Sequence, residues 1–410
     1  MTSVYPLSKK CFAELVSTLS MVMDMEENIK LYHGWRVALF ADRIGNVLGM
    51  PTDELFYGGL LHDIGALGME DHIVHRIMNG DYLNDPKILA HPLKGAAIVK
   101  RLPGMERIAL YVEDHHERWD GKGYPAGKKG REISGGGQVI LAADLIDISL
   151  RHIKKPDIKK IVDSFRTLKS FFRPDIYEAA LEVLGDIPFV AAMVDYNNLR
   201  YYIESRIRLE EDQCSPDQQG GEIFINIFAD IIDAKHAYTG GHSRRVGEYS
   251  LYIGRVLNIG SLFEDNLYKA ALLHDFGKVA VPKRILDARR RLSEAEFNIV
   301  KQHPVHTIEL LNSVTSLSFL AEAAGGHHER YDGKGYPRGL KGSDIPLYSQ
   351  IISLADSLDA ITSDRPYQKA RSFSRAAEII GEMRGTQFDP DITDAALEAI
   401  KEFAVKEKIV

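Results

Sequence analysis

A chain of 410 residues is long enough to form two domains of about 200 residues each. Hydrophobic residues make up 45% of the chain and charged residues 27%, proportions that are typical of soluble globular proteins. The net charge of −7 at pH 7 excludes a broad basic surface, so we expect no binding to duplex DNA or RNA.

Cysteine content and hydropathy also bound the environment of the chain. Its two cysteines, Cys11 and Cys214, lie in different halves, so we expect no disulfide framework and a reduced, cytoplasmic setting. No apolar run approaches the length of about 18 residues that a membrane span requires. The apolar stretch near the N-terminus is interrupted by Glu14 and Asp24, which predicts a helix rather than a signal peptide.

The first half of the chain is predicted to consist of helices. Apolar residues recur at helical spacing over residues 1–35, and a second helical stretch ends at Leu48, before a break at residues 49–51. A conspicuous string, HHERWDGKGYP, runs from His115 to Pro125. The histidines and aspartates that recur in this half are His33, His62, Asp63, His91, His115, His116 and Asp144.

The second half repeats the first. The string HHERYDGKGYP, from His327 to Pro337, is almost identical to its earlier counterpart. The matching residues are His242, His274, Asp275, His303, His327, His328 and Asp356. In both sets 29 residues separate the second histidine from the third, 24 the third from the fourth, and 28 the fifth histidine from the final aspartate. Such matched spacing indicates a tandem duplication with shared side-chain geometry.

Few strand signals are present, so we predict an all-α protein made of two similar helical domains. The predicted boundaries are residues 1–205 for the first domain, 206–221 for a linker and 222–410 for the second domain. Residues 210–221 (EEDQCSPDQQGG) have linker composition. The N-terminal helices of the repeats can pack one domain on the other or form a homodimer, and the sequence favours neither.

The second set of residues offers five imidazoles and two carboxylates. These ligands suit Mn, Fe or Zn, and no cysteine favours a closed structural zinc site. Seven ligands exceed the need of one tetrahedral ion, so we expect two divalent metal ions with a bridging carboxylate. Two metals about 3.5–4 Å apart that share a hydroxide form a clamp for in-line displacement at phosphorus, with the hydroxide as the attacking group.

Each motif also has a structural interpretation. A lone His-Asp or His-His pair is usually a satisfied polar pair, and only the repeated set favours a metal site. Lys278 follows the second His-Asp pair by one helical turn. It is either a solvated lysine stabilised by the end of its helix or a contact for phosphate or the leaving group. The basic residues between Lys283 and Arg291 are either a solvated face or attract an anionic ligand.

The motifs of the second half resemble the HD-GYP family, which belongs to the HD superfamily of metal-dependent phosphohydrolases. The resemblance covers nearly all of residues 222–400. It is carried by His274-Asp275-x-Gly277-Lys278, His303-Pro304, the string HHERYDGKGYP, residues 356–367 (DSLDAITSDRPY) and residues 387–390 (QFDP). It implies a helical domain with a di- or trinuclear Fe or Mn centre. It also implies hydrolysis of 3′,5′-linked cyclic dinucleotides, usually c-di-GMP, to a linear dinucleotide or mononucleotides.

The resemblance also implies roles for single residues. By motif, the metal ligands are His242, His274, Asp275, His303, His327, His328 and Asp356, with Asp275 bridging. We expect Asp275 and Lys278 to serve catalysis, Lys278 and Arg365 to contact phosphate, and Gly335, Tyr336 and Pro337 to shape the substrate site. Relatives with a trinuclear centre commonly carry Glu four residues before the first ligand histidine. Here that residue is Tyr238, which predicts a dinuclear site.

The first half resembles the family less closely. All seven ligand positions are retained, as His33, His62, Asp63, His91, His115, His116 and Asp144. However, Ala66 stands at the lysine position and Ile153 at the arginine position, and the segment after Asp144 is four residues shorter than its counterpart (30 against 34). We therefore predict a degenerate domain that binds metal without efficient turnover and has a regulatory or structural role.

The substrate is left open between two cyclic dinucleotides. The family favours c-di-GMP, whereas a tandem arrangement with a degenerate first copy also resembles phosphodiesterases specific for 3′3′-cGAMP. One alternative function is a non-catalytic sensor that binds a cyclic dinucleotide and acts through partner proteins, and Lys278 and Arg365 argue against it. Another is a different HD phosphohydrolase such as a nucleotidase, and the GYP strings argue against that.

Overall fold

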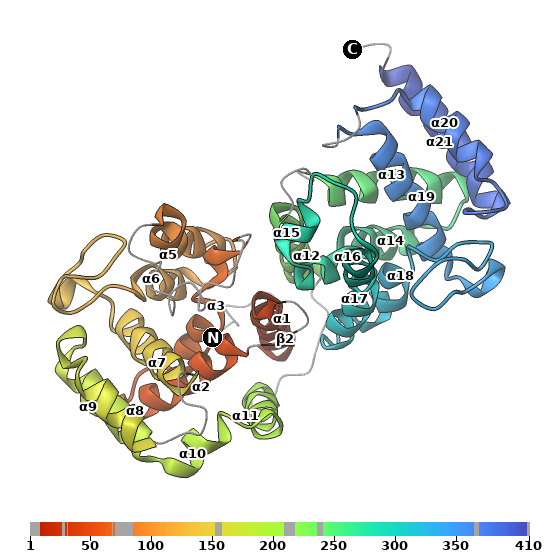
Figure 1. Ribbon diagram of the computed structural model, residues 1–410. Helices are drawn as coiled ribbons and strands as arrows, with labels where there is room; N and C mark the ends of the chain where they lie inside the picture. Colours follow the sequence, from red (N-terminus) through yellow and green to blue (C-terminus); the bar gives the residue numbers. More distant parts are fainter. Residues whose placement is uncertain are drawn as a thin grey trace. The chain divides into compact units, whose positions relative to one another are not determined.

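The computed structural model describes residues 9–26, 29–30, 32–67, 69, 85–151, 158–208, 218–235, 241–364 and 369–407. The chain forms two compact units, Met1–Gly221 and Glu222–Val410 (Figure 1). Of the predicted linker, residues 206–208 belong to the helix Tyr196–Arg208, and residues 218–221 begin the helix Gln218–Lys235, which continues into the second unit.

The prediction of an all-α protein is confirmed, with one small departure. Two strands of two residues each, β1 (Met25–Glu26) and β2 (Ile29–Lys30), pair antiparallel between the first two helices. Everything else with regular structure in the described part of the chain is helical. No helix there is long and apolar enough to cross a membrane.

The first unit contains α-helices and short 3₁₀ helices. The α-helices are α1 (Lys9–Met23), α2 (His33–Leu48), α3 (Thr52–Leu61), α5 (Pro86–Val99), α6 (Glu106–Asp114), α7 (Gly135–Arg151), α8 (Ile158–Arg166), α9 (Pro174–Gly185), α10 (Ile187–Ala192) and α11 (Tyr196–Arg208). The 3₁₀ helices are η1 (Ile64–Ala66), η3 (Gly130–Glu132) and η4 (Lys169–Phe171).

The second unit repeats this order of elements. Its α-helices are α12 (Gln218–Lys235), α13 (His242–Val256), α14 (Ser261–Leu273), α15 (Lys283–Leu286), α16 (Glu294–Val300), α17 (His303–Asn312), α18 (Ala321–Gly325), α19 (Leu347–Thr362), α20 (Phe373–Glu382) and α21 (Pro390–Glu407). Its 3₁₀ helices are η5 (Phe276–Ala280), η6 (Ser318–Leu320) and η7 (Gly342–Asp344).

The core of each unit forms where corresponding helices meet. In the first unit α2 packs on α3 and α7, and α6 packs on α3, α5 and α7. In the second, α13 packs on α14 and α19, and α18 packs on α14, α17 and α19. Fully buried aromatic side chains in the cores include Phe40 and Phe56 in the first unit and Phe228 and Phe276 in the second. Burial of each such side chain stabilises the fold by roughly 1.5–3 kcal/mol, so packing rather than helix propensity holds the elements in place.

A glycine allows one close contact that is repeated in both units. A Cβ atom added to Gly277 of η5 would lie 1.9 Å from the carbonyl oxygen of His303 in α17, and one added to Gly65 of η1 would lie 2.0 Å from that of His91 in α5. Only glycine therefore lets the turn after each His-Asp pair lie directly on the helix that carries the next histidine.

The predicted capping box before α16 is confirmed. The hydroxyl of Ser293 accepts a hydrogen bond from the backbone N–H of Glu296, and the carboxylate of Glu296 accepts one from the backbone N–H of Ser293. The helix that this box opens ends at Val300, whose carbonyl oxygen accepts a hydrogen bond from the ring of His303. The cap therefore stabilises the backbone that orients His303.

Ser293→Ala is expected to destabilise α16 by about 1 kcal/mol, the usual cost of losing an N-cap side chain. Hydrogen exchange of the amides in the first turn of α16 would measure the effect. Ser293→Asp, which keeps an acceptor at the same place, serves as the control. Equal protection in the alanine variant and the wild type would contradict a stabilising cap.

Candidate metal centre

The seven predicted ligands of the second unit come from five different elements and converge on one buried point. His242 is the first residue of α13, and His274 and Asp275 follow α14. His303 opens α17, His327 and His328 follow α18, and Asp356 lies in α19. The ligand atoms of His242, His274 and Asp356 lie within 4.8 Å of one another, and so do those of His303, His327 and His328.

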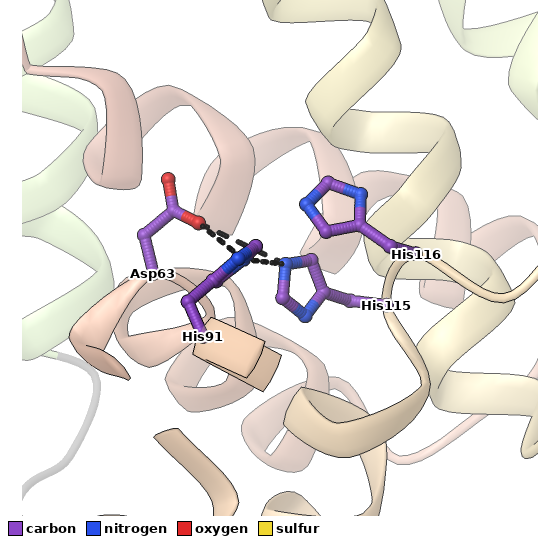
Figure 2. A group of neighbouring side chains, drawn as sticks. All are labelled: Asp63, His91, His115 and His116. Carbon is purple, nitrogen blue, oxygen red and sulfur yellow. Dashed lines mark hydrogen bonds and ion pairs between the residues drawn. The ribbon is translucent and has the colours of Figure 1, made fainter. Parts of the chain in front are cut away.

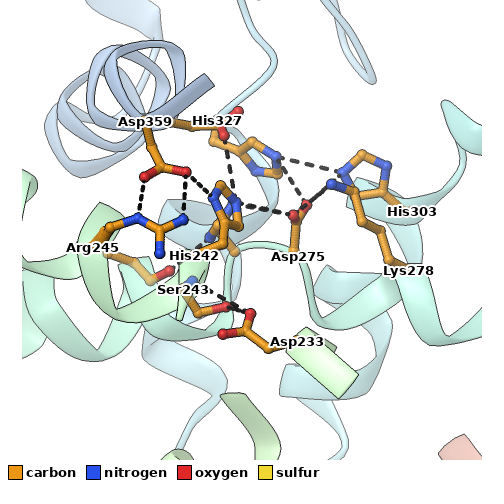
Figure 3. Close-up of polar contacts among 12 residues, drawn as sticks. Asp233, His242, Ser243, Arg245, Asp275, Lys278, His303, His327 and Asp359 are labelled. Atoms are coloured by element: carbon orange, nitrogen blue, oxygen red, sulfur yellow. Dashed lines mark hydrogen bonds and ion pairs between the residues drawn. The ribbon is translucent and has the colours of Figure 1, made fainter. Parts of the chain in front are cut away.

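Asp275 lies between these two groups (Figure 3). Its Oδ2 is 3.6 Å from Nε2 of His242 and 3.3 Å from Nε2 of His274. Its Oδ1 is 3.3 Å from Nε2 of His303 and 3.8 Å from Nε2 of His327. Each carboxylate oxygen thus faces a different group of ligands, which is the arrangement a bridging carboxylate needs.

The tautomers of the histidines test whether a cation fits here. Nδ1 of His274, His303 and His327 each lies 2.7 Å from the backbone carbonyl oxygen three residues earlier. A carbonyl only accepts, so each Nδ1 carries the proton and each Nε2 presents a lone pair. Nε2 of His303 and His327 are 3.4 Å apart, and buried Nε2 of His274 has no hydrogen-bond partner. Lone pairs that face one another in a buried site fit a bound cation.

Burial and neighbouring groups keep the second ligand group neutral. Burial lowers the pKa of His303, and burial together with His328 lowers the pKa of His327 well below its ordinary value. Burial and the nearby His303 lower the pKa of His328 to about 3. Neutral imidazoles are the form that binds metal, so these three side chains require no loss of a proton at neutral pH.

The carboxylate at the centre is held in its charged form. Burial on its own raises the pKa of Asp275, but His274 and Lys278 outweigh it and hold that pKa well below the usual range. Nζ of Lys278 donates to Oδ2 of Asp275 over 2.5 Å. Lys278 therefore lies in the site, at one of the two oxygens that face the ligands.

One side chain behind His242 was not predicted from the sequence. Nδ1 of His242 donates to Oδ2 of Asp359 over 2.7 Å, and Nε of Arg245 donates to Oδ1 of the same carboxylate over 2.5 Å. Burial lowers the pKa of His242, but hydrogen bonds to Asp275 and Asp359 raise it to about 9. The duplication could have revealed Asp359 in the sequence. His33, Arg36 and Asp147 of the first unit have the same order and make the same contacts.

Asp359→Asn is expected to weaken metal binding by the second unit by roughly 10–100-fold, the usual effect of removing the carboxylate that orients a ligand histidine. The change keeps the shape but removes the charge that aligns His242. Titration of the metal-stripped protein, followed by calorimetry, would measure it. Asp147→Asn in the first unit is the matched control, and equal loss of second-unit affinity in both variants would contradict a local orienting role.

The loop of the repeated string folds back on the paired histidines. The backbone N–H of Tyr336 donates to the carbonyl of His328, and a Cβ on Gly335 would lie 2.6 Å from that carbonyl, so glycine is required there. Both carboxylate oxygens of Glu329 accept backbone N–H groups of the loop, from Arg338 and Leu340. The ring of Tyr336 faces that of His328 at 4.8 Å, and the peptide before Pro337 is cis.

Two predicted features lie outside the described residues. Arg365, the second predicted phosphate contact, belongs to residues 365–368, and Tyr238, on which the dinuclear prediction depends, belongs to residues 236–240. Both stay predictions.

The first unit contains an equivalent centre (Figure 2). Oδ2 of Asp63 is 3.6 Å from Nε2 of His33 and 3.3 Å from Nε2 of His62. Oδ1 of Asp63 is 3.3 Å from Nε2 of His91 and 3.7 Å from Nε2 of His115. His116 completes the group with Asp63, His91 and His115, and Asp144 completes the group with His33 and His62.

The two centres differ in their electrostatics. Nδ1 of His91 and of His115 again donate to the carbonyl three residues earlier, at 2.5 and 2.6 Å. Ala66, however, replaces the lysine that contacts the bridging carboxylate. Burial raises the pKa of Asp144, whereas the pKa of its counterpart Asp356 is lowered by His242 and His274 against the effect of burial. Among the described residues, the first centre keeps the seven candidate ligands but has no lysine at the position from which Lys278 contacts Asp275 in the second.

Each helical unit thus has a buried aspartate surrounded by imidazoles. This arrangement places the protein among helical proteins whose candidate metal ligands come from several helices. Comparison with known proteins identifies the family within that class. Residues 15–148 and 226–392 both match the HD domain family, so the chain belongs to this family and contains two copies of its domain. The resemblance found in the sequence is confirmed.

Several relatives have assigned activities. The chain is 32% identical over 328 residues to 3′3′-cGAMP-specific phosphodiesterase 3 of Vibrio cholerae, which covers 79% of this chain and 70% of that protein. It is 39% identical over 180 residues to a cyclic di-GMP phosphodiesterase of Thermotoga maritima, covering 43% and 48%. A crystal structure of a cyclic GMP-AMP specific phosphodiesterase from V. cholerae, V-cGAP3, superposes with a TM-score of 0.66 and 26% identity, covering 95% and 97% of the two chains.

Proposed function

We propose that this protein is a metal-dependent phosphodiesterase that hydrolyses 3′3′-linked cyclic dinucleotides to a linear dinucleotide. We assign catalysis to the second domain, residues 222–410, and a regulatory or structural role to the first, residues 1–205. The observation that carries the proposal is the position of Asp275, whose two oxygens face two separate groups of three ligands. The relatives that act on 3′3′-cGAMP and on cyclic di-GMP support the substrate class.

The residues of the second unit fit a pair of divalent metal ions, with Fe or Mn expected from the ligand types. One ion would be held by His242, His274 and Asp356, the other by His303, His327 and His328, and Asp275 would bridge them. When bound, such ions lower the pKa of water and stabilise negative charge at phosphorus.

Lys278 supplies a positive charge next to this centre. Its ammonium group contacts Oδ2 of Asp275, and its side chain is 22% exposed, so it can reach solvent. We propose that Lys278 turns to a phosphate oxygen of the substrate when cations take over the charge of Asp275. Arg365 is proposed to contact the same phosphate from the segment after α19.

The first unit is proposed to bind metal without efficient turnover. Its ligands have the same geometry, but it lacks the counterpart of Lys278. Alanine substitution of His62 and Asp63 is expected to remove metal from this unit while most of the specific activity remains. Loss of most of the activity, with folding and second-unit metal retained, would contradict an accessory role.

The activity is tested by incubating the anaerobically Fe- or Mn-loaded protein with c-di-GMP and with 3′3′-cGAMP separately, and separating the products by chromatography. Turnover of either substrate that disappears in Asp275→Ala is the expected result, and the ratio of the two rates settles the preferred substrate. If neither is hydrolysed by protein that holds its metal, the proposed activity is contradicted and the alternative of a non-catalytic cyclic-dinucleotide sensor is favoured.

A further inference from the structure

A cavity of about 240 Å³ opens beside the candidate metal centre of the second unit. Two of its walls are the ligands His328 and Asp356, so whatever enters it lies against the centre. The other lining residues combine the ring of Tyr336 with the polar side chains of Glu329, Arg330, Ser353, Ser357 and Gln387. The cavity is smaller than the pockets that hold whole drug-sized ligands, so it fits one part of a cyclic dinucleotide rather than all of it.

Two serines of the wall, Ser353 and Ser357, each carry a hydroxyl group. Within the described part of the chain, neither Ser353 nor Ser357 makes a side-chain hydrogen bond. A hydroxyl in a helix commonly donates to the carbonyl four residues earlier, as Thr362 of the same helix does to Leu358. Serine hydroxyls donate and accept, so both can bind either kind of group on a ligand.

The carboxamide of Gln387 is different, because its orientation is determined. Arg330 is held by a fork of hydrogen bonds to the carboxylate of Asp332, at 3.0 and 2.8 Å. Its remaining terminal nitrogen donates to Oε1 of Gln387 over 3.0 Å. A guanidinium only donates, so the oxygen of the carboxamide must face Arg330. The NH₂ group of Gln387, with two donor hydrogens, is therefore left for the cavity.

The first unit shows the same positions without this polar wall. Phe171 corresponds to Gln387, because its carbonyl accepts the backbone N–H of Trp119 as that of Gln387 accepts the N–H of Tyr331. Arg118, the counterpart of Arg330, lies 3.4 Å over the ring of Phe171. The two serines are replaced by Leu141 and Leu145. The first unit therefore keeps all seven candidate ligands but has apolar side chains at the three positions that Ser353, Ser357 and Gln387 occupy in the second unit.

We propose that this cavity binds one nucleoside of the substrate and that Gln387, oriented by Arg330, selects guanine there. The inference rests on the proposed function. Guanine presents two adjacent acceptors, O6 and N7, to a donor pair, whereas adenine places a donor NH₂ group beside N7. The NH₂ group of Gln387 can donate to both acceptors of guanine, whereas at adenine it would face another donor NH₂ group. A guanine-containing cyclic dinucleotide is then bound with its guanosine against α19 and the scissile phosphate at the metal ligands.

Gln387→Glu tests the proposal, because glutamate still accepts the hydrogen bond from Arg330 but replaces the donor NH₂ by an acceptor. The first measurement is kcat/KM for c-di-GMP and for c-di-AMP with the metal-loaded full chain. The ratio of the two values is expected to fall by about tenfold or more, the usual range for one base-edge contact. The matched control is Phe171→Leu in the first unit, which is expected to leave the ratio unchanged.

The second measurement is independent of hydrolysis. GMP and AMP contain no phosphodiester bond, so their binding to the metal-loaded protein is measured by calorimetry. The wild type is expected to prefer GMP, and Gln387→Glu to lose that preference. Gln387→Met, which removes the donor without adding a charge, is expected to do the same while metal content stays at the wild-type level.

The two measurements separate the two proposals. If the wild type hydrolyses no cyclic dinucleotide but its preference for GMP disappears in Gln387→Glu, the proposed function fails and the guanine pocket stands. If the wild type hydrolyses c-di-GMP and both ratios are unchanged in the variants, the enzyme stands and the role of Gln387 is overturned. Equal binding of GMP and AMP by the wild type overturns it as well.

Discussion

Asp275→Asn will reduce kcat for cyclic dinucleotides by more than about 10³-fold, which exceeds the roughly 10–100-fold typical of residues that only orient a ligand. The substitution keeps the size of the side chain but removes the negative charge that both ligand groups share. It also leaves Lys278 without the carboxylate that it contacts. Product chromatography under saturating substrate, with metal content measured on the same sample, would determine the loss.

The duplication supplies the control for this experiment. Asp63→Asn makes the identical change in the first unit, where Asp63 has the same four imidazole neighbours. We expect this variant to lose metal from the first unit and to keep kcat close to that of the wild type. If both variants lost activity equally, the assignment of catalysis to the second unit would be wrong.

Gly277→Ala is expected to destabilise the second unit by about 3 kcal/mol, at the upper end of the usual cost of overpacking, and to weaken its metal binding. The new methyl group would lie 1.9 Å from the carbonyl oxygen of His303 and 2.6 Å from the backbone nitrogen of Thr307. These are backbone atoms, so relief requires α17 to move away from η5. His303 would move with it, away from Oδ1 of Asp275. Calorimetric unfolding and metal titration would record the two effects.

Two other glycines make this prediction specific. Gly381, in α20, has no atom within 4 Å of an added Cβ, so Gly381→Ala is expected to be neutral or stabilising by about 1 kcal/mol through helix propensity. Gly65→Ala repeats the clash in the first unit, 2.0 Å from the carbonyl of His91, and is expected to spare the activity. A Gly277→Ala variant as stable as Gly381→Ala would contradict the packing argument.

The ligand set could be predicted from the sequence because the duplication preserved its spacing. Two copies of the same separations identified which histidines and aspartates belong together, and the structure gathers all fourteen into two equivalent clusters. The helical fold was predictable for a similar reason, since apolar periodicity is a local property. What spacing could not give is the role of each atom. That Oδ1 and Oδ2 of Asp275 face different histidines depends on five elements meeting in space.

Other features were hidden because they depend on contacts rather than on motifs. Apart from its counterpart Asp147 in the first unit, nothing in the sequence distinguishes Asp359 from other helical aspartates, because its role comes from lying behind His242. Ser357 is an ordinary helical serine until α19 is packed beside the loop that carries His328 and Arg330. The donor character of Gln387 follows from a single hydrogen bond between residues 57 positions apart. These contacts between distant residues form only in the packed structure, so local sequence patterns do not predict them.

The hydrogen bonds from the ring Nδ1 atoms to main-chain carbonyls have a consequence for how the protein acquires its metal. His274, His303 and His327 are each tied to the helix turn that precedes them, so their positions are set by folded backbone. We therefore expect the fold to form without the cation, unlike that of small metal-nucleated domains. Chelation should empty the enzyme without unfolding it, and resupply should restore it. Activity would then rise and fall reversibly with the supply of the metal.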